Sequence, residues 1–154
     1  STTKVSCMCV SPCGDMLYVG SSNGIVDKWE GVSSISKEPK VTQLSIRSPY
    51  SPSTNSSNST EDECSGPGLD PENTGVVALC NDSKHLYATW GNSPLILKIN
   101  SNGKRVGQFK GHVGRVRALA LQTATDSEEG KETKESRELY SCSEDATVCF
   151  CCRL

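Results

Sequence analysis

The chain has 154 residues, of which 34% are hydrophobic and 22% are charged, and its formal net charge is −2. This length suffices for one modest domain with a buried core, and a weakly acidic chain gives no reason to expect nucleic acid as a ligand. No apolar run reaches the roughly 18 residues of a membrane-spanning helix, and the first residues lack the apolar core of a signal peptide. We therefore expect no membrane association and a cytoplasmic or nuclear, reducing location.

The nine cysteines are an odd number, and thiols stay free in a reducing compartment. Most of them occupy strand-like segments, where Cys acts as a small apolar residue: Cys7, Cys9, Cys80, Cys142, Cys149 and Cys151. The alternative is a metal or redox site built from Cys149, Cys151 and Cys152, joined by Cys13. Zinc ligands usually follow Cys-x2-4-Cys spacing, whereas neighbours on an extended strand point to opposite faces. Core packing is therefore favoured, and we expect no metal or cofactor.

Residues 1–46 predict one four-stranded antiparallel sheet. Strand-like apolar patterns occur at residues 5–10, 16–20, 25–30 and 41–46. A Pro-Cys-Gly-Asp turn separates the first two strands, and Asn23 with Gly24 forms a strong hairpin signal before the third. Residues 47–74 then break the pattern, because Ser, Pro and acidic residues there leave little to bury. We expect a mobile, acidic loop insertion.

The rest of the chain predicts seven more strands. In the region 75–110 they lie at residues 75–80, 86–90, 95–99 and 106–109. In the region 111–154, strands at 116–121 and 138–143 flank a charged insertion at 123–137, and a third strand opens at Thr147 and Val148. This last sheet lacks a fourth, outer strand.

The residues at the strand boundaries of these regions resemble those of the WD40 β-propeller family. Gly111 and His112 precede a strand, Ser143 and Asp145 close the next one, and Trp29 stands near the end of the third strand of the first region. Val5 and Val77 lie 72 residues apart, of which the loop takes 28 and leaves 44, and Val77 and Val116 lie 39 apart. Both spacings are near the roughly 40–45 residues of a WD40 repeat.

The resemblance implies an all-β fold of four-stranded antiparallel blades, set side by side as an incomplete propeller of about three blades. Region 75–110 is a degenerate blade, because Ile99 stands near the family's Trp position and no Asp occupies the turn before that strand. Propellers typically need four to eight blades to close. The remainder of a larger propeller, or a second chain, is therefore expected to complete the ring.

The family resemblance also implies a buried hydrogen-bond network within each blade. A His before the first strand, a Ser or Thr on the second, an Asp in the following turn and a Trp on the third take part in it. By position, the third blade supplies His112, Ser141 or Ser143, and Asp145, with Cys151 at the Trp position, which interrupts the network. The first blade supplies Trp29 and Asn23. His112 is interpreted as structural, because no catalytic nucleophile or metal partner is spaced near it.

The function that follows is a non-catalytic protein–protein interaction scaffold. The chain contains no P-loop, no Gly-x-Ser-x-Gly and no His-Glu-x-x-His motif. The alternative is a cysteine-based metal-binding or redox protein. The two insertions hold ten acidic and four basic residues, which leaves the blades at +4. Lys110, Arg115 and Arg117 form a candidate rim for protein partners, including acidic or phosphorylated segments.

Overall fold

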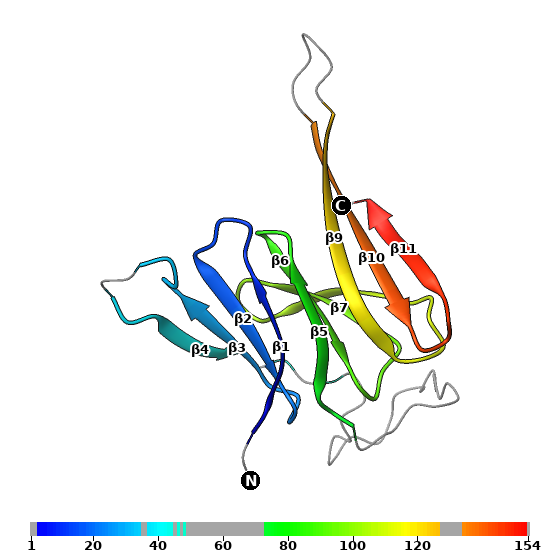
Figure 1. The fold of residues 1–154 in the computed structure, drawn as a ribbon, viewed down its shortest axis with the longest axis horizontal. Coiled ribbons are helices and arrows are strands. Elements are labelled where there is room, and N and C mark those ends of the chain that lie inside the picture. Colours follow the sequence, from blue (N-terminus) through cyan, green and yellow to red (C-terminus); the bar gives the residue numbers. More distant parts are fainter. Residues whose placement is uncertain are drawn as a thin grey trace.

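Eleven strands in three antiparallel sheets make up the described part of this computed structural model (Figure 1). The described residues are 3–34, 37–44, 46, 48, 73–126 and 134–153. The predicted loop insertion at 47–74 lies outside these ranges, apart from Ser48, Asn73 and Thr74. In the described part, no helix is long and apolar enough to cross a membrane.

Each sheet follows chain order. Blade 1 contains β1 (Val5–Val10), β2 (Met16–Ser21), β3 (Val26–Glu30) and β4 (Lys40–Leu44). Blade 2 contains β5 (Val76–Asn81), β6 (His85–Trp90), β7 (Ile96–Asn100) and β8 (Arg105–Phe109). Blade 3 contains β9 (Val116–Asp126), β10 (Lys134–Ser143) and β11 (Val148–Arg153), with β11 at its edge. The predicted all-β fold of propeller-type blades is confirmed, and the three blades do not close a ring over the described residues (Figure 1).

Two core layers separate the three blades. The layer between blades 1 and 2 contains Tyr18, Val26, Leu44, Ile46, Val76, Leu79, Leu86, Ala88, Trp90, Leu97 and Ile99. The layer between blades 2 and 3 contains Cys80, Tyr87, Ile96, Val116 and Leu139. Successive side chains of a strand point to opposite faces, so β6 contributes to both layers. Burial on both faces explains why this degenerate blade reads as nearly continuous apolar sequence.

Close backbone approach joins blades 1 and 2. The indole Nε1 of Trp90 donates to the carbonyl of Gly24, at 3.1 Å, in the turn between β2 and β3. Ser6 Oγ donates to the carbonyl of Val76 at 2.6 Å. A Cβ added at Gly20 would lie 2.7 Å from a methyl group of Val76, so any larger residue would push the blades apart.

The paired strands of blade 3 run further than the sequence predicts. We expected strands to end at residue 121 and resume at 138, with a charged insertion between them. Instead, the ladder continues through pairs such as Thr123 with Arg137 and Asp126 with Lys134. The extension needs no apolar face, because a β-ladder is held by backbone hydrogen bonds, and β-branched Thr123 and Thr125 favour strands.

The outward faces of blades 1 and 3 carry exposed apolar side chains. On blade 1, Met8 is 70% exposed and Val10 is 56% exposed. On blade 3, Val148 is 74% exposed and Phe150 is 53% exposed. Their strand neighbours Cys7, Cys9 and Cys151 pack against the core layers, so by alternation these side chains lie on the faces that point away from blade 2. Each end of the row of blades therefore carries exposed apolar side chains.

One hairpin turn recurs in all three blades. It spans Ser21 to Gly24, Asn100 to Gly103 and Ser143 to Ala146. In each turn the fourth residue donates its amide to the carbonyl of the first, at 3.0, 3.0 and 3.2 Å, respectively. The fourth residue has a positive φ of 83°, 79° and 63°, respectively. Glycine adopts this left-handed conformation at no steric cost, whereas Ala146 is strained.

We expect Ala146→Gly to raise the free energy of unfolding by about 0.5–1 kcal/mol, because relief of left-handed strain exceeds the added freedom of the unfolded chain. Urea unfolding followed by circular dichroism measures the change. The matched control is Ala118→Gly on β9, whose backbone is not left-handed, and it should lower stability by a similar amount. If both variants lose stability, the turn is not strained at Ala146.

Candidate functional site

A buried polar chain links the loop before β9 to the second and third strands of blade 3. His112 Nδ1 lies 3.2 Å from Asp145 Oδ2, and its Nε2 lies 2.8 Å from Ser141 Oγ. The side chains of His112 and Asp145 are only 3% and 8% exposed. Because a carboxylate only accepts, the contact with Asp145 places the ring proton of neutral His112 on Nδ1, and Nε2 then accepts from the Ser141 hydroxyl.

The side chain of Asp145 also holds the loop before β9, by accepting hydrogen bonds from backbone amides of that loop. Its Oδ2 accepts from the amide of Val113 at 2.9 Å and from that of Gly114 at 3.4 Å. Thr147 donates both its hydroxyl, at 2.5 Å, and its amide, at 2.9 Å, to Oδ1. The hydroxyl of Thr147, opposed by partial burial and assisted by these amides, lowers the pKa of Asp145 well below its usual range.

We expect Asp145→Asn to destabilise the protein at pH 7 and to destabilise it less at pH 3. The folded-state pKa of Asp145 is depressed, so its stabilising contribution is complete above the unfolded-state pKa of about 3.9 and is lost as pH falls through the folded-state value. Urea unfolding at pH 7 and pH 3 tests this. The exposed Glu38 supplies the control Glu38→Gln, and an Asp145→Asn effect that is the same at both pH values would contradict the expectation.

The structure distinguishes among the residues that the sequence predicts for the blade 3 network. Ser141, rather than Ser143, contacts His112, and Ser143 Oγ accepts from the amide of Asp145 at 3.2 Å. Cys151 was expected to interrupt the chain, yet its Sγ lies 3.2 Å from Ser141 Oγ. A thiol therefore extends the chain at this position, as a weak hydrogen-bonding group can.

Blade 1 does not form the predicted network, which corrects the assignment of Trp29 and Asn23. Asn23 Oδ1 accepts from the amide of Ile25 at 3.2 Å, within its own turn. Trp29 Nε1 is buried without a hydrogen-bond partner among the described residues. The reason lies on the strand beside it: the position that holds Ser141 in blade 3 holds Val19 in blade 1, and valine offers no acceptor.

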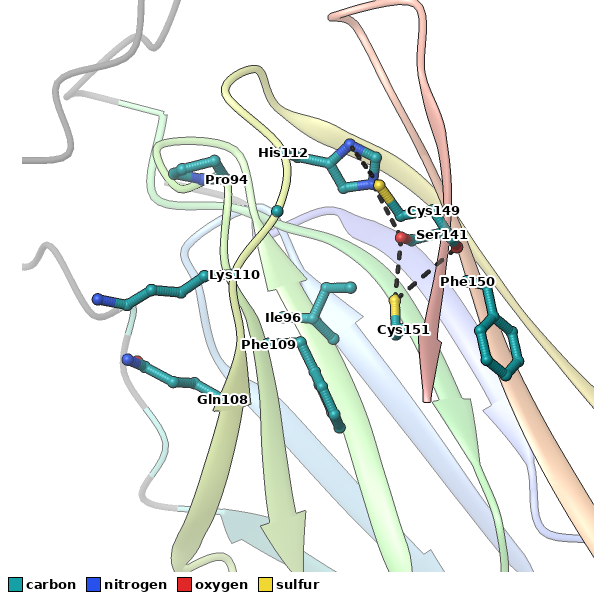
Figure 2. Close-up of a pocket in the computed structure, with 11 residues that line it drawn as sticks. Pro94, Ile96, Gln108, Phe109, Lys110, His112, Ser141, Cys149, Phe150 and Cys151 are labelled. Carbon is teal, nitrogen blue, oxygen red and sulfur yellow. Dashed lines mark hydrogen bonds between the residues drawn. The ribbon is translucent and has the colours of Figure 1, made fainter. Parts of the chain in front are cut away.

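A cavity of about 410 Å³ lies where blade 2 meets the edge of blade 3. Ile96 and Phe109 form one wall, and Ser141, Cys149 and Cys151 form the other (Figure 2). Lys110 and Gln108 also border it, but their side chains extend away from Ser141 and Cys151 (Figure 2). The cavity therefore presents apolar groups, two thiols, one buried hydroxyl and the imidazole of His112.

Glu144 divides the predicted basic rim. Its carboxylate lies 3.7 Å from Arg115 Nε and forms an ion pair with Arg117 Nη2. The side chain of Arg115 is 15% exposed, whereas that of Arg117 is 54% exposed. Lys110 is exposed on the loop that borders the cavity. The rim thus offers Lys110 and Arg117 to solvent, with Glu144 offsetting part of its charge.

A second polar cluster, centred on Asp82 in blade 2, was not predicted. Tyr87 Oη donates to Asp82 Oδ2 at 2.8 Å, and the amides of His85 and Lys84 donate to Oδ1 at 2.6 and 2.9 Å. Burial alone would raise the pKa of Asp82, but these donors outweigh it and lower the pKa. Arg137 of β10 donates to the Asp82 backbone carbonyl. The sequence signal for this cluster was Asp82 itself, but an Asp between Asn81 and Ser83 is equally expected in an ordinary turn.

The cysteines do not form a metal centre in the described part of the chain. No group of three or more His, Cys, Asp or Glu residues there could hold an ion. Burial raises the pKa of Cys9 to about 12 and also raises the pKa values of Cys80 and Cys151. Thiols of this kind are poor nucleophiles at neutral pH. Cys13 differs, because it is exposed and the Ser11 hydroxyl, 3.1 Å from its sulfur, lowers its pKa.

Iodoacetamide at pH 7.5 should therefore alkylate Cys13 before Cys9, Cys80 and Cys151, and at least about tenfold faster than Cys80, since only the thiolate reacts. Peptide mass spectrometry of samples quenched at successive times measures the order. In 8 M urea the difference should disappear, because it arises from folded surroundings. Rapid native alkylation of Cys80 would show that the core layer between blades 2 and 3 is open.

Comparisons with known proteins add a partial match. A family model described as "WD domain, G-beta repeat" matches residues 1–30. No curated protein matches the chain. Among solved structures, the computationally designed Ika8 protein is 14% identical, with a TM-score of 0.47, over 87% of this chain and 29% of that chain. The designed Ika4 protein is 11% identical, with a TM-score of 0.41, over 97% of this chain and 91% of that one.

Proposed function

Because the chain carries a WD40 repeat in residues 1–30 and folds into propeller-type blades, we propose that it is a non-catalytic scaffold for protein–protein interactions. The observation that carries the proposal is the row of stacked blades, whose two end faces expose Met8, Val10, Val148 and Phe150. Faces of this composition bury apolar area when they meet another sheet. In the proposed role, the remainder of a larger propeller or a second chain covers them.

The polar chain of blade 3 supports the non-catalytic part of the proposal. Asp145, His112 and Ser141 have the connectivity of a catalytic triad, but Ser141 is 2% exposed. A hydrolytic nucleophile must contact the substrate carbonyl, beside donors for the developing oxyanion. The carboxylate of Asp145 instead ties the loop at Val113 to the turn at Thr147. This pattern of contacts suits a structural clasp.

We also place the protein in a reducing compartment, the cytoplasm or nucleus. The support is the use of cysteine as a core residue: Cys80 is buried between blades 2 and 3, and Cys7 and Cys9 pack against the layer between blades 1 and 2. Buried thiols of this kind need no oxidising environment.

The partner surface that we propose, the loop face, is formed by Lys110 and Val113 of the loop between β8 and β9 and by Arg117 near the start of β9. Val113 is 61% exposed and stands between the two cations in sequence. An apolar group beside exposed positive charge suits an acidic or phosphorylated peptide segment, for which Arg provides bidentate hydrogen bonds. Glu144 pairs with Arg117 and repels an acidic partner. A phosphate group, which carries more charge than a carboxylate, should therefore be needed to displace Glu144 from Arg117.

A fluorescein-labelled nonapeptide of glutamates with one central phosphoserine tests the proposal by anisotropy titration. We expect Lys110→Ala/Arg117→Ala to weaken binding by up to about fivefold for each charge, because an exposed ion pair is worth at most about 1 kcal/mol. Raising the salt concentration should reduce the difference.

Lys104→Ala is the matched control. Lys104 and Lys110 flank opposite ends of β8, and both are exposed, so the two changes remove the same charge from opposite edges of blade 2. Equal effects of the two lysines would mean that the peptide responds only to net charge, and the loop face would lose its proposed role.

A further inference from the structure

Two of the recurring hairpin turns end in the same dipeptide, Asn followed by Gly. The pairs are Asn23 with Gly24, between β2 and β3, and Asn102 with Gly103, between β7 and β8, and the sequence contains no other Asn-Gly pair. Such a pair is prone to lose the side-chain amide of Asn, because Gly has no side chain to hinder attack of its backbone nitrogen on the carboxamide. The chain therefore offers one chemistry in two different surroundings.

The two turns have nearly the same backbone. The amides of Gly24 and Gly103 each donate to the carbonyl of the first turn residue at 3.0 Å, and their φ angles are 83° and 79°. Asn23 and Asn102 are both exposed. A difference in reactivity between the two pairs must therefore come from what surrounds the carboxamide and the glycine, rather than from the turn itself.

The first pair is held from several directions. The Asn23 Oδ1 atom accepts from the amide of Ile25 at 3.2 Å. Gly24 is buried where blades 1 and 2 meet: its carbonyl accepts from the Trp90 indole at 3.1 Å, and an added Cβ would lie 2.5 Å from the carbonyl oxygen of Thr74. Attack on the carboxamide requires the peptide group between Asn23 and Gly24 to rotate. In this turn the rotation disturbs contacts between two blades.

The second pair is held less firmly. Among the described residues, no hydrogen bond engages the carboxamide of Asn102, whose backbone amide alone donates to Asn100 Oδ1 at 3.1 Å. Gly103 is half-buried, and the atom nearest to an added Cβ would be a methyl carbon of Leu44 at 3.4 Å, which is an ordinary contact. The same rotation here disturbs the hairpin turn itself and a flexible side chain.

We propose that Asn102 is a site of spontaneous deamidation in the folded protein and that the contacts of Asn23 and Gly24 protect the first pair. The Gly103 nitrogen forms a bond to Cγ of Asn102, and the side-chain nitrogen leaves as ammonia, with the proton of the attacking amide. A succinimide ring remains. Water opens it at Cγ to give Asp, or at the backbone carbonyl to give isoaspartate, so water is the only co-reactant.

Both products would alter the turn between β7 and β8. Each adds a negative charge two residues from Lys104. The isoaspartyl product also adds a methylene group to the backbone between Asn100 and Lys104, whose hydrogen bonds at 2.9 Å close the turn. Gly103 lies beside Leu44, which is buried in the layer between blades 1 and 2. A reaction at an exposed residue thus reaches the packing of two blades.

The test is incubation of the intact chain at mildly alkaline pH in water enriched in heavy oxygen, followed by digestion in ordinary water and peptide mass spectrometry. Each acid formed during the incubation takes up one heavy oxygen atom, which distinguishes it from the encoded Asp residues. We expect Asn102 to convert at least about tenfold faster than Asn23, a barrier difference of about 1.4 kcal/mol. A carboxyl methyltransferase specific for isoaspartate, with labelled S-adenosylmethionine, should label the peptide that contains position 102.

Two variants and one condition separate the cause from the dipeptide. In denaturing urea the two rates should converge, because the contacts that distinguish the pairs are lost. Trp90→Phe removes the bond to the Gly24 carbonyl but keeps an aromatic ring, so it should accelerate the reaction at Asn23 and leave that at Asn102 unchanged. Asn102→Gln should abolish both labels at position 102, because a Gln would have to close a larger ring.

The comparison within the wild-type chain decides the proposal even if Trp90→Phe fails to fold. Equal rates at the two pairs in the folded chain, or a faster reaction at Asn23, would overturn it. So would a reaction at Asn102 that occurs in urea but not in the folded chain. The proposal does not rest on the interaction role proposed above, since the reaction needs no partner, so loss of phosphopeptide binding at Lys110 and Arg117 leaves this test unaffected.

Discussion

A β-sheet has two faces, and the structure depends on how many of them find a partner. Blade 2 has both faces covered, and every side chain from Leu86 to Trp90 is at most 2% exposed. Burying one large apolar side chain is worth about 1.5–3 kcal/mol, so the two layers around blade 2 provide most of the packing energy. Blades 1 and 3 each bury one face, and their outward faces remain apolar. The same constraint therefore accounts for the stability of the centre and for the exposed apolar side chains at the ends.

Polar side chains in each blade address a second constraint, the attachment of turns to strands. Blade 3 uses Asp145 and His112, and blade 2 uses Asp82 and Tyr87. Both carboxylates accept several donors, and both have lowered pKa values as a result. Blade 1 has no such carboxylate at Asn23, and the indole nitrogen of Trp29 is buried without a partner in the described structure. An unpaired buried donor costs stability, so blade 1 depends more on its contacts with blade 2, such as the bond from Trp90 to Gly24.

The cavity beside Cys151 arises from two differences between blade 3 and blade 1. A small thiol stands where blade 1 has Trp29, and no fourth strand lies beside β11 in the described chain. The small side chain leaves volume between Ile96 and Ser141, and the open edge gives access to it. The sequence suggested both features separately, as a missing Trp and a missing outer strand. Only their positions in space show that they meet at one place, opposite Phe109 of the neighbouring blade.

Much of the fold follows from local sequence. Alternating apolar residues mark the strands, and turn residues such as Asn23 and Gly24 mark the hairpins, because strand period and positive φ are local properties. The pairing of His112 with Ser141 or Ser143 and Asp145 could be anticipated from motif position. The longer hairpin of β9 and β10 could not, because residues 122–126 and 134–137 lack the alternation of large apolar residues that marks a strand, although their backbones pair.

The sequence by itself therefore determined the strands, the order in which they pair and the polar groups available to blade 3. The tertiary structure decided which of those groups meet. It brought Arg137 to the carbonyl of Asp82, placed Glu144 between Arg115 and Arg117, and left Trp29 without an acceptor among the described residues. These outcomes depend on how one sheet stacks on the next and on which side chain faces which. Contacts between residues distant in sequence arise from packing, which no local pattern encodes.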